Sequence, residues 1–481
     1  MELASSELRR LTSADRARLV FRVVQLLLIW SPVAFMGVVY GLSILVSARY
    51  IKFERISDAV GRAFLQTLLW SISRCGAAFI KWAQWAATRD DLFSTTACNV
   101  LSQLHDGAPI HSFSRTRRAI LANFGAPIES LFLSFDEAPL ASGSVAQVYR
   151  AVLRPEVVTR AIAHGSGTIE SQLLSSIAEG GEDLQVAVKV SHPDVARRIQ
   201  DDFFLLELVA DVTRAFPMLR WLRLRETLSN FSHTMGTQAD LRVEAQHLHR
   251  FAFNFQGRRD RITCPYPIPG LCSREVLVET FQTGELVKSY ILEQGDENFQ
   301  ICSLGVECYM KMLLEDNFIH SDLHPGNFLI SRDASHLNLC LLDFGMAEEL
   351  PAWVSKEFIS FIFALAEGNG HRVADALLRW ARVQECRDPG AFRREVVHLI
   401  NTECQLHEGS VDLDAVIKAI LRLAHSHCVT VDAEFGLLCV GMCVLVGFAR
   451  QLDGETCLLE AAVPTFIAFH LTGKSLGKLY G

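Results

Sequence analysis

The chain contains the stretch IHSDLHPGN at residues 319–327 and the tripeptide DFG at residues 343–345. Asp322 and Asn327 lie five positions apart in the first motif, and Asp343 follows Asn327 by sixteen positions. Apolar residues follow the first motif and precede the second, which predicts two short strands. A polar turn between two buried strands does not require an aspartate, an asparagine and a second aspartate in this order. The spacing therefore predicts a site for nucleotide phosphates and a metal ion.

Phosphoryl transfer from a nucleoside triphosphate needs an Asp facing the transferred group, an Asn holding a magnesium ion and a second Asp linking metal to phosphates. Asp322, Asn327 and Asp343 supply these groups in that order. Such a site also needs a lysine that contacts the α- and β-phosphates and a carboxylate that holds this lysine. Lys189, on the predicted strand VAVKV, and Glu244, on a predicted helix, are the candidates. The sequence therefore predicts ATP and Mg²⁺ as cofactors.

Two further stretches predict contacts with the nucleotide. A turn of small residues between short predicted strands lets the backbone approach a ligand closely, and we expect it to cover the phosphates: Ala141, Ser142, Gly143, Ser144 and Val145. The apolar strand at 276–280 presents Glu279 and leads into a helical region, so adenine is expected beside it. A solvated strand end is the other interpretation of Glu279. Residues 155–185, which contain four glycines among Ser and Glu, predict a long surface insertion in a hairpin loop.

The composition limits the class of protein. The chain has 481 residues, half of them apolar, which is enough for a two-lobed core with appendages. A formal net charge of −8 gives no basic excess, so no nucleic-acid partner is expected. The 13 cysteines include no C-x-x-C pair, and HSHC at 425–428 has no second ligand pair at zinc-finger spacing. We therefore expect reduced core thiols and no zinc site.

Residues 23–46 form a run of 24 residues without a charge. As a helix this run reaches about 36 Å, which is enough to cross a bilayer and too long for the core of a signal peptide. We expect one transmembrane helix here, with its orientation open because basic residues flank both ends. The 22 residues before it contain Arg and Ser as a mitochondrial presequence does, together with three acidic residues that such presequences lack. The apolar run at 435–449 is shorter and predicts a buried helix.

Together the motifs resemble those of the UbiB, or AarF-domain, family of atypical kinases. The resemblance covers residues 75–350 and depends on the order of five motifs: KWAQ at 81–84, ASGSVAQVYRA at 141–151, VAVKVSHP at 186–193, QADLRVE at 238–244 and HSDLHPGN at 320–327. The first is similar to the family's K-x-G-Q helix, and the second to its alanine-rich loop. The family implies a role in ubiquinone biosynthesis at a membrane. Within the family, this chain is most similar to mitochondrial members. The implied partners are ATP, a membrane lipid or quinone precursor and quinone-biosynthesis proteins, at the mitochondrial inner membrane.

The resemblance implies an α+β, two-lobed protein-kinase-like fold with a helical N-terminal extension, preceded by one transmembrane helix. The implied domains are an N-terminal segment with the transmembrane helix, a helical extension, a small lobe and a helical large lobe, at residues 1–56, 57–132, 133–284 and 285–481. By the same resemblance, Asp322 is the catalytic-loop Asp, Lys189 contacts phosphates and Glu244 orients it. Asn327 and Asp343 would bind magnesium.

A helix carrying Lys81 and Gln84 is implied to lie across the active site, where a protein substrate would dock, with Gln238 and Asp240 beside it. This gating group favours ATP hydrolysis or small-molecule chemistry over phosphorylation of proteins, as does the lack of an A-P-E sequence after DFG. Ala83 and Gln238 replace the family's Gly and Glu, which puts the gating role in question. Two alternatives stay open: a lipid-binding or scaffold protein without catalysis, and a phosphotransferase for a small hydroxylated substrate.

Overall fold

The computed structural model describes residues 12–47, 54–87, 110–181, 183–213, 235–292, 297–321, 325–333, 336–403 and 413–452, with single positions at 98, 100, 101, 228, 232, 295 and 323. The chain forms two compact units. The first contains residues 1–154, 188–241 and 273–277, and the second contains residues 155–187, 242–272 and 278–481. The predicted lobe boundary at residue 284 stays a prediction.

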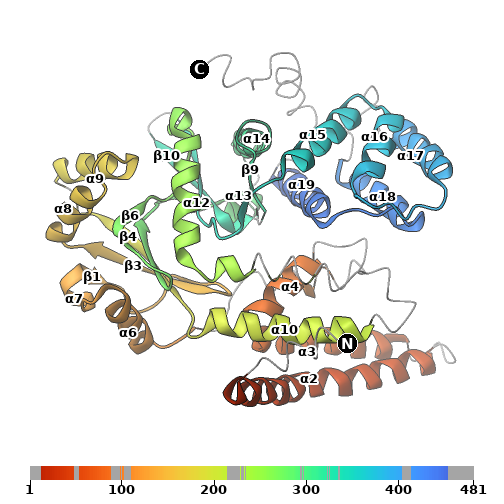
Figure 1. The fold of residues 1–481 in the computed structure, drawn as a ribbon, viewed down its shortest axis with the longest axis horizontal. Helices are drawn as coiled ribbons and strands as arrows, with labels where there is room; N and C mark the ends of the chain where they lie inside the picture. The colour runs from red at the N-terminus through yellow and green to blue at the C-terminus, as the bar shows by residue number, and fades with distance from the viewer. Residues whose placement is uncertain are drawn as a thin grey trace. The chain divides into compact units, whose positions relative to one another are not determined.

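Four helices pack together in the first unit: α2 (Ser13–Ser47), α3 (Glu54–Cys75), α4 (Ala77–Ala87) and α10 (Val195–Thr213). α2 and α3 lie side by side and antiparallel (Figure 1), with the Tyr40 and Phe64 rings stacked at 5.7 Å. The hydroxyl of Ser71 donates to the carbonyl oxygen of Ile29 at 2.9 Å. α2 contains the run predicted as a helix at 23–46 and begins ahead of it, at Ser13, whereas the crossing of a membrane stays a prediction.

A buried ion pair joins these helices. The Arg22 guanidinium of α2 donates to both carboxylate oxygens of Asp202 on α10, at 2.6 and 2.8 Å. The same guanidinium donates to the carbonyl of Cys75, where α3 ends, and to Oε1 of Gln25 at 2.8 Å. Arg18 makes a second pair, with Asp201, at 2.8 Å. Arg22 therefore connects α2 with the α3–α4 turn and with α10.

One six-stranded sheet has the order β1-β3-β4-β7-β6, with β2 paired to β3. Its strands are β1 (Phe132–Phe135), β2 (Ala141–Ser142), β3 (Ala146–Leu153), β4 (Gln185–Ser191), β6 (Pro267–Cys272) and β7 (Val276–Thr280). The helices α6 (Phe113–Phe124) and α7 (Ile128–Leu131) precede β1. β4 and β7 are buried along nearly their whole length, as expected for central strands rich in valine. The strands predicted at 186–190 and 276–280 are confirmed.

Residues 155–185 lie between β3 and β4, as predicted, but they form two helices, α8 (Pro155–His164) and α9 (Ile169–Glu179), and not a surface loop. Apolar residues on one face of α8 are buried, and α8 packs against β6. Gly165 approaches β6 so closely that a Cβ there would lie 2.7 Å from Cγ of Pro269. Glu170 of α9 is also buried and lies 2.5 Å from Nδ1 of His249. The loop prediction is wrong because it weighed glycine content above the spacing of the apolar residues.

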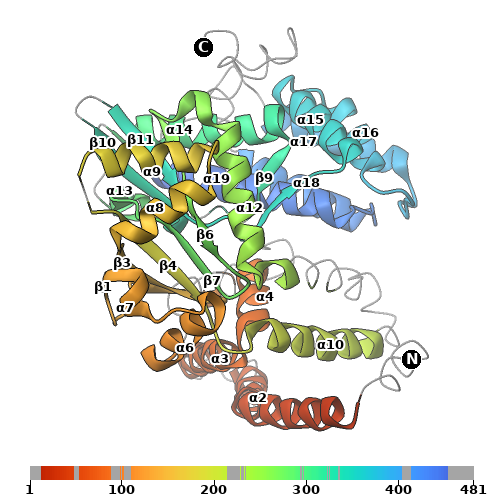
Figure 2. The same ribbon diagram turned by 60° about the vertical axis from the view of Figure 1, so that its left-hand side comes forward.

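The second unit contains α12 (Leu241–Asn254), nearly all of which falls in it, a four-stranded sheet and a two-stranded sheet (Figure 2). The four-stranded sheet has the order β5-β11-β10-β8, and the two-stranded sheet pairs β9 with β12. The strand bounds are β5 (Ile262–Thr263), β8 (Glu285–Leu286), β9 (Phe318–His320), β10 (Phe328–Asp333), β11 (His336–Leu341) and β12 (Ala347–Glu349). Short helical turns occur at Gln256–Arg258, Met312–Asp316 and Pro325–Asn327. The strands predicted on either side of the two motifs are therefore present.

The remaining helices of the second unit are α13 (Val287–Leu292), α14 (Asn298–Lys311), α15 (Ala352–Ala366), α16 (Gly370–Arg379), α17 (Pro389–Glu403), α18 (Leu413–Ser426) and α19 (Ala433–Leu452). α19 is the helix predicted at 435–449, and its 20 residues exceed the predicted run. More than half of its apolar window is buried, which agrees with a core helix. In the region of the HSHC sequence, His427 pairs with Glu395 at 3.1 Å.

Candidate active site

The open end of the β10–β11 hairpin brings the two predicted metal ligands together. Phe328 pairs with Leu341, and the N–H of Leu342 donates to the carbonyl of Asn327 at 2.9 Å. Asn327 directly precedes β10, and Asp343 comes two residues after β11. Residues sixteen positions apart in the sequence therefore leave the hairpin from neighbouring backbone positions. Asn327 is buried, whereas Asp343 is exposed.

Hydrogen bonds fix the turn that presents Asp343. Its Oδ1 accepts from the N–H of Gly345 at 2.8 Å, so the carboxylate is oriented by its own turn. Its backbone carbonyl accepts from Nε2 of His320, and the carbonyl of Phe344 accepts from Nδ1 of His247 at 2.8 Å. A carbonyl can only accept, so both ring nitrogens carry the proton. Burial lowers the pKa of His247, its bond to the Phe344 carbonyl acts in the opposite direction, and the neighbouring His320 and Arg250 lower the pKa further.

Phe344 anchors the turn in an aromatic cluster on α12. Its fully buried ring lies 4.6 Å from the ring of Phe251, which stacks on Phe255 at 4.2 Å. Glu244 precedes Phe251 by seven positions, about two helical turns, and so lies on the same face of α12. Glu244 is itself buried. The helix that packs on Phe344 therefore also carries the predicted carboxylate.

Asp322, the predicted catalytic-loop residue, lies outside the described residues. The chain before it is held by pairing of β9 with β12, and the N–H of Ser321 donates to the carbonyl of Met346 at 2.8 Å. Leu323, directly after it, is buried. The role of Asp322 stays a prediction.

The small-residue turn of the first unit is a tight hairpin between β2 and β3. Ser142 pairs with Gln147, and the N–H of Gly143 donates to the carbonyl of Ala146 at 2.9 Å. Lys189 lies on β4, next to β3 in the sheet, and is only 8% exposed. A buried ammonium needs a negative partner, so its burial agrees with a role in holding phosphates or a carboxylate.

The predicted gating helix and the small-residue turn at 141–145, called the nucleotide turn below, share one hydrophobic cluster. Its buried members and the side chains packed against it are Ala77, Ala78, Val195, Ile199, Phe203, Ala210, Leu228, Met235 and Ala239, with Trp82, Val145, Ala196 and Leu206. The cluster joins α4, which carries Lys81 and Gln84, to the turn through Val145. It also contains Ala239, between the predicted gating residues Gln238 and Asp240. α4 and α10 lie side by side in both ribbon views (Figures 1 and 2).

Glu279, near the end of β7, is buried with 2% of its surface exposed, so the interpretation as a solvated strand end is wrong. The N–H of the next residue, Thr280, donates to the carbonyl of Tyr266 at 2.9 Å. The proximity of Glu279 to adenine stays a prediction, as does the pairing of Lys189 with Glu244. The residues that the structure does bring together are Asn327 with Asp343.

The histidines that hold the DFG carbonyls were not assigned this role from the sequence. His247 follows Glu244 by three positions on α12, so helical spacing could have placed it on the side of the helix that carries Glu244. Its partner, a backbone carbonyl 97 positions away, leaves no trace in the sequence.

Comparison with known proteins identifies relatives of this chain. The profile of the ABC1 atypical kinase-like domain matches residues 103–161 and 174–377. The chain is 30% identical to the probable serine/threonine-protein kinase abkC of Dictyostelium discoideum, over 83% of this chain and 64% of that protein. It is 27% identical to the mitochondrial ABC1 family protein YPL109C of Saccharomyces cerevisiae, over 86% of this chain and 69% of that protein.

A bacterial relative and a solved structure extend the comparison. The chain is 28% identical to the probable protein kinase UbiB of Shewanella baltica strain OS185, over 82% of this chain and 68% of that protein. The structure of Mycobacterium tuberculosis Rv3197, solved with erythromycin, has a TM-score of 0.51 and 17% identity and covers 85% of this chain and 97% of that chain. At this identity the likeness concerns the fold, which is an atypical kinase-like fold of mixed helix and sheet.

Proposed function

Because the chain belongs to the ABC1 family of atypical kinase-like proteins, we propose that it binds ATP with Mg²⁺ and transfers or hydrolyses the γ-phosphoryl group. The observation that supports the proposal is the hairpin register, in which the backbone of Asn327 is bonded to Leu342, the residue before Asp343. Mg²⁺ prefers oxygen ligands and binds one or two protein groups together with nucleotide phosphates, which an amide and an exposed carboxylate suit. When bound, the ion would neutralise charge on the phosphates.

The proposal assigns a role to each of the other site residues. Lys189 on β4 contacts the α- and β-phosphates, and Glu244 on α12 orients it. Asp322 faces the γ-phosphoryl group. The turn at 141–145 covers the phosphates, and Glu279 with its neighbouring backbone lies beside adenine. The burial of Lys189 and Glu244 supports these roles, since neither charge is stable in a core without a partner.

The gating group favours hydrolysis or a small substrate over a protein substrate. Lys81 and Gln84 lie one turn apart on α4, whose cluster includes Val145 of the nucleotide turn. A helix held this close to the turn restricts the space in which a protein chain could dock. The sequence also lacks the A-P-E segment that follows DFG in protein kinases. We therefore propose a membrane lipid or a quinone precursor, and not a protein, as the substrate.

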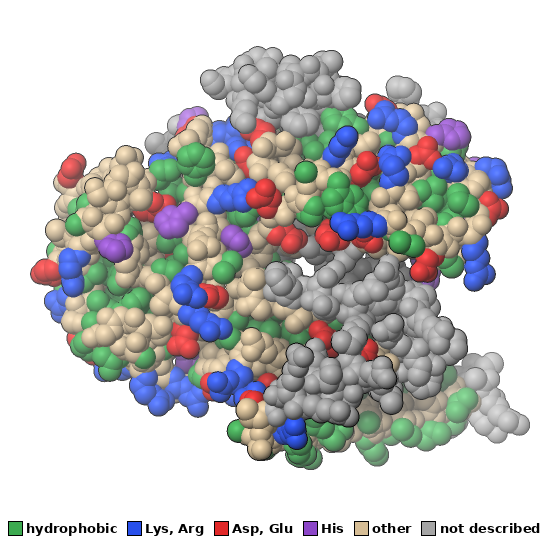
Figure 3. Space-filling model, viewed as in Figure 1, with side chains coloured by type: hydrophobic (Ala, Val, Ile, Leu, Met, Phe, Trp, Pro, Cys, Tyr) green, Lys and Arg blue, Asp and Glu red, His purple; other side chains and the backbone are tan. Residues whose placement is uncertain are grey.

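The location proposed is a membrane of the mitochondrion, where the protein supports ubiquinone biosynthesis or lipid metabolism. The yeast relatives carry the word mitochondrial in their names, and the Shewanella relatives are named UbiB. Helix α2 is long and apolar enough to cross a bilayer, and only 6% of its apolar window is buried. Hydrophobic side chains gather along it in Figure 3. These observations support a membrane contact through α2.

The test is nucleotide binding by the purified full-length chain in mild detergent. At a concentration of ATP 100-fold above its Kd, with Mg²⁺, we expect stabilisation of about 2.7 kcal/mol, seen as a rise in Tm. Asp343→Asn should abolish the magnesium-dependent part, while the control Asp136→Asn, at an exposed carboxylate, should keep it. No shift of the wild type at saturating ATP would refute the proposal. Binding without turnover of ATP would favour the lipid-binding or scaffold alternative.

A further inference from the structure

One residue after β4 holds the nucleotide turn at two points. The backbone N–H of His192 donates to the carbonyl of Val145 at 2.8 Å. Its ring Nε2 lies 2.9 Å from the carbonyl oxygen of Gly143. His192 follows Lys189 by three positions and comes directly after the end of β4, so the strand that carries the predicted phosphate lysine leads into the residue that fixes the turn.

The ring of His192 is in turn set by a second histidine. Nδ1 of His192 lies 2.9 Å from Nδ1 of His111, and the two rings meet edge to face. Because the Gly143 carbonyl can only accept, Nε2 of His192 carries a proton, and in the neutral ring Nδ1 is the acceptor. His111 must then donate from Nδ1, which leaves its Nε2 as an acceptor.

The hydroxyl of Thr116 is the donor that Nε2 of His111 needs. Nε2 of His111 lies 3.1 Å from the hydroxyl of Thr116, which lies 2.7 Å from the hydroxyl of Tyr149. Gln147 donates from Nε2 to the Tyr149 oxygen, and its Oε1 accepts from the backbone N–H of His111 at 3.0 Å. With both rings neutral, one set of proton positions satisfies every bond from Gln147 to the turn. Thr116, Gln147 and Tyr149 are fully buried.

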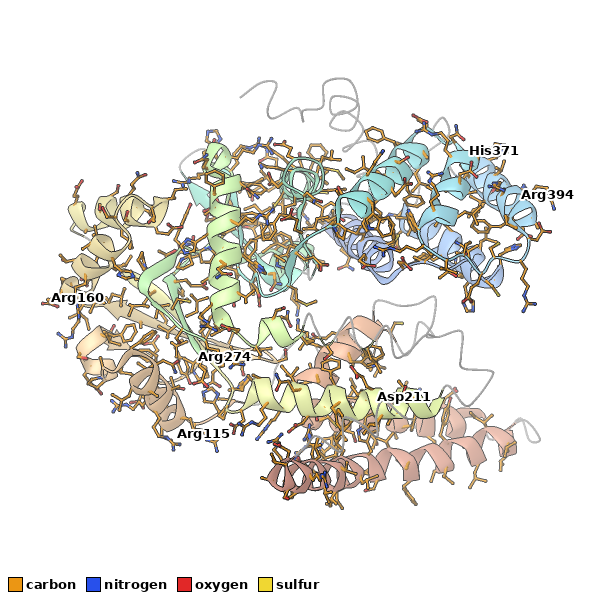
Figure 4. All side chains as sticks on the ribbon, in the orientation of Figure 1. Arg115, Arg160, Asp211, Arg274, His371 and Arg394 are labelled. Atoms are coloured by element: carbon orange, nitrogen blue, oxygen red, sulfur yellow. The ribbon has the colours of Figure 1, made fainter. Side chains whose placement is uncertain are left out.

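The burial of the two rings, with the charges around them, favours this neutral state. Burial lowers the pKa of His111 to about 4, and the repulsion that a charged His111 would meet from Arg115 and from a protonated His192 acts in the same direction. Burial also lowers the pKa of His192, with a further contribution from Arg198, while its bond to Gly143 acts in the opposite direction. Arg115 lies on α6 (Figure 4), and Arg198 on α10.

Peptide geometry connects this network to a ligand. In a trans peptide the C=O and the following N–H point in opposite directions. With the Gly143 carbonyl directed at His192, the N–H of Ser144 is directed away from that ring. Backbone N–H groups presented by a tight turn are donors for anions such as phosphates.

We propose that His192 is a positioning residue for the nucleotide phosphates, which fixes the Gly143–Ser144 peptide so that the Ser144 N–H can donate to a phosphate oxygen. This inference rests on the proposed binding of ATP. The role of His111, and of Thr116 behind it, is to hold the His192 ring in the orientation and tautomer that the turn requires.

Two substitutions of similar size separate this role from a general effect on folding. The amide nitrogen of Gln can occupy the position of Nε2 and keep the bond to Gly143, whereas that of Asn corresponds to Nδ1 and loses it. We expect His192→Asn and His192→Leu to raise the Kd for Mg-ATP about tenfold, and His192→Gln to stay within about twofold of wild type. The control is His371→Leu, at an exposed histidine of α16 (Figure 4), which should bind as wild type does.

A second readout does not depend on ATP. In the nucleotide-free protein, hydrogen exchange of a peptide covering residues 141–147 should be faster in His192→Asn and His192→Leu than in wild type, and unchanged in His192→Gln. If exchange is faster in these variants but the wild type binds no ATP, then His192 does fix the turn and the proposed function is refuted. Wild-type Kd and exchange in His192→Leu, or equal loss in Asn and Gln variants, would overturn the inference. If His192→Leu does not fold, Thr116→Val, which breaks the network at its buried end, is expected to weaken binding in the same direction.

Discussion

The buried pair of Arg22 and Asp202 makes a quantitative prediction about the first unit. Asp202 is 1% exposed and Arg22 8% exposed, and the guanidinium also donates to the carbonyl of Cys75 and to Gln25. Removing one partner of such a pair leaves a buried group without its counter-charge and costs about 3–5 kcal/mol. In a unit of about 200 residues this cost corresponds to a fall in Tm of roughly 6–20 °C.

The perturbation is Arg22→Met, which keeps an aliphatic stem of similar reach and removes the charge. We follow unfolding by circular dichroism on the purified full-length chain in mild detergent. We expect the Tm of this variant to be lower than that of wild type by the amount given above. The control is Arg62→Met at an exposed position of α3, which should unfold within about 1–2 °C of wild type. The double variant Arg22→Met with Asp202→Leu should recover part of the loss, because it removes the uncompensated carboxylate.

The loss should also depend on pH. Burial raises the pKa of Asp202 above its ordinary value of 3.8, and Arg22 opposes this rise. Without Arg22 the pKa rises further, so the unfolded chain releases the proton at a pH where the folded chain still retains it. The pKa of Asp202 is already raised in the wild type, so the stability of Arg22→Met relative to wild type should fall as the pH rises from the wild-type pKa to the higher pKa of the variant. A deficit that does not grow as the pH is raised from 3.8, or a Tm equal to that of wild type, would refute the reasoning.

Three further predictions follow from packing and exposure. Gly284→Ala should destabilise the second unit by at least about 2 kcal/mol in urea unfolding, because φ is +153° and a Cβ would lie 2.6 Å from the carbonyl oxygen of Ile330; an unchanged midpoint would contradict it. Phe344→Ala should cost about 3–5 kcal/mol by the same assay, since its buried ring fills the aromatic cluster on α12, whereas a loss below about 1 kcal/mol would mean that the cluster does not hold the turn. Leu28→Asp with Phe35→Asp, at side chains 69% and 68% exposed on α2, should weaken partitioning into phospholipid vesicles at least about tenfold in a flotation assay, and undiminished partitioning would exclude this face as the membrane contact.

The parts of the fold that sequence reasoning predicted are those specified by local patterns. The strand around Lys189 is flanked by valines, and the hairpin behind Asn327 and Asp343 is bounded by apolar runs, so both could be placed before any coordinates. The helices α8 and α9 could not be distinguished from a loop by glycine and serine content, although the apolar spacing of α8 was present.

Contacts between distant residues could not be predicted. His111 and His192 lie 81 positions apart, and Arg22 and Asp202 lie 180 apart, with nothing local to indicate either pair. Arg22 was interpreted as one of the basic residues flanking an apolar run, yet its charge is buried against α10. The structural role of such residues depends on their burial and on their partners in the folded chain, and a single sequence shows neither.

The most direct measurement of the central claim is a double-mutant cycle on Asn327 and Asp343, read as the Kd for ATP with and without Mg²⁺. If both side chains hold the same ion, Asn327→Ala and Asp343→Asn should each remove most of the magnesium-dependent affinity. The double variant should then lose little more than either single variant, giving a coupling of about 1–3 kcal/mol that vanishes when EDTA replaces Mg²⁺. Losses that simply add, or a coupling that persists without the metal, would contradict a shared magnesium site at the end of the β10–β11 hairpin.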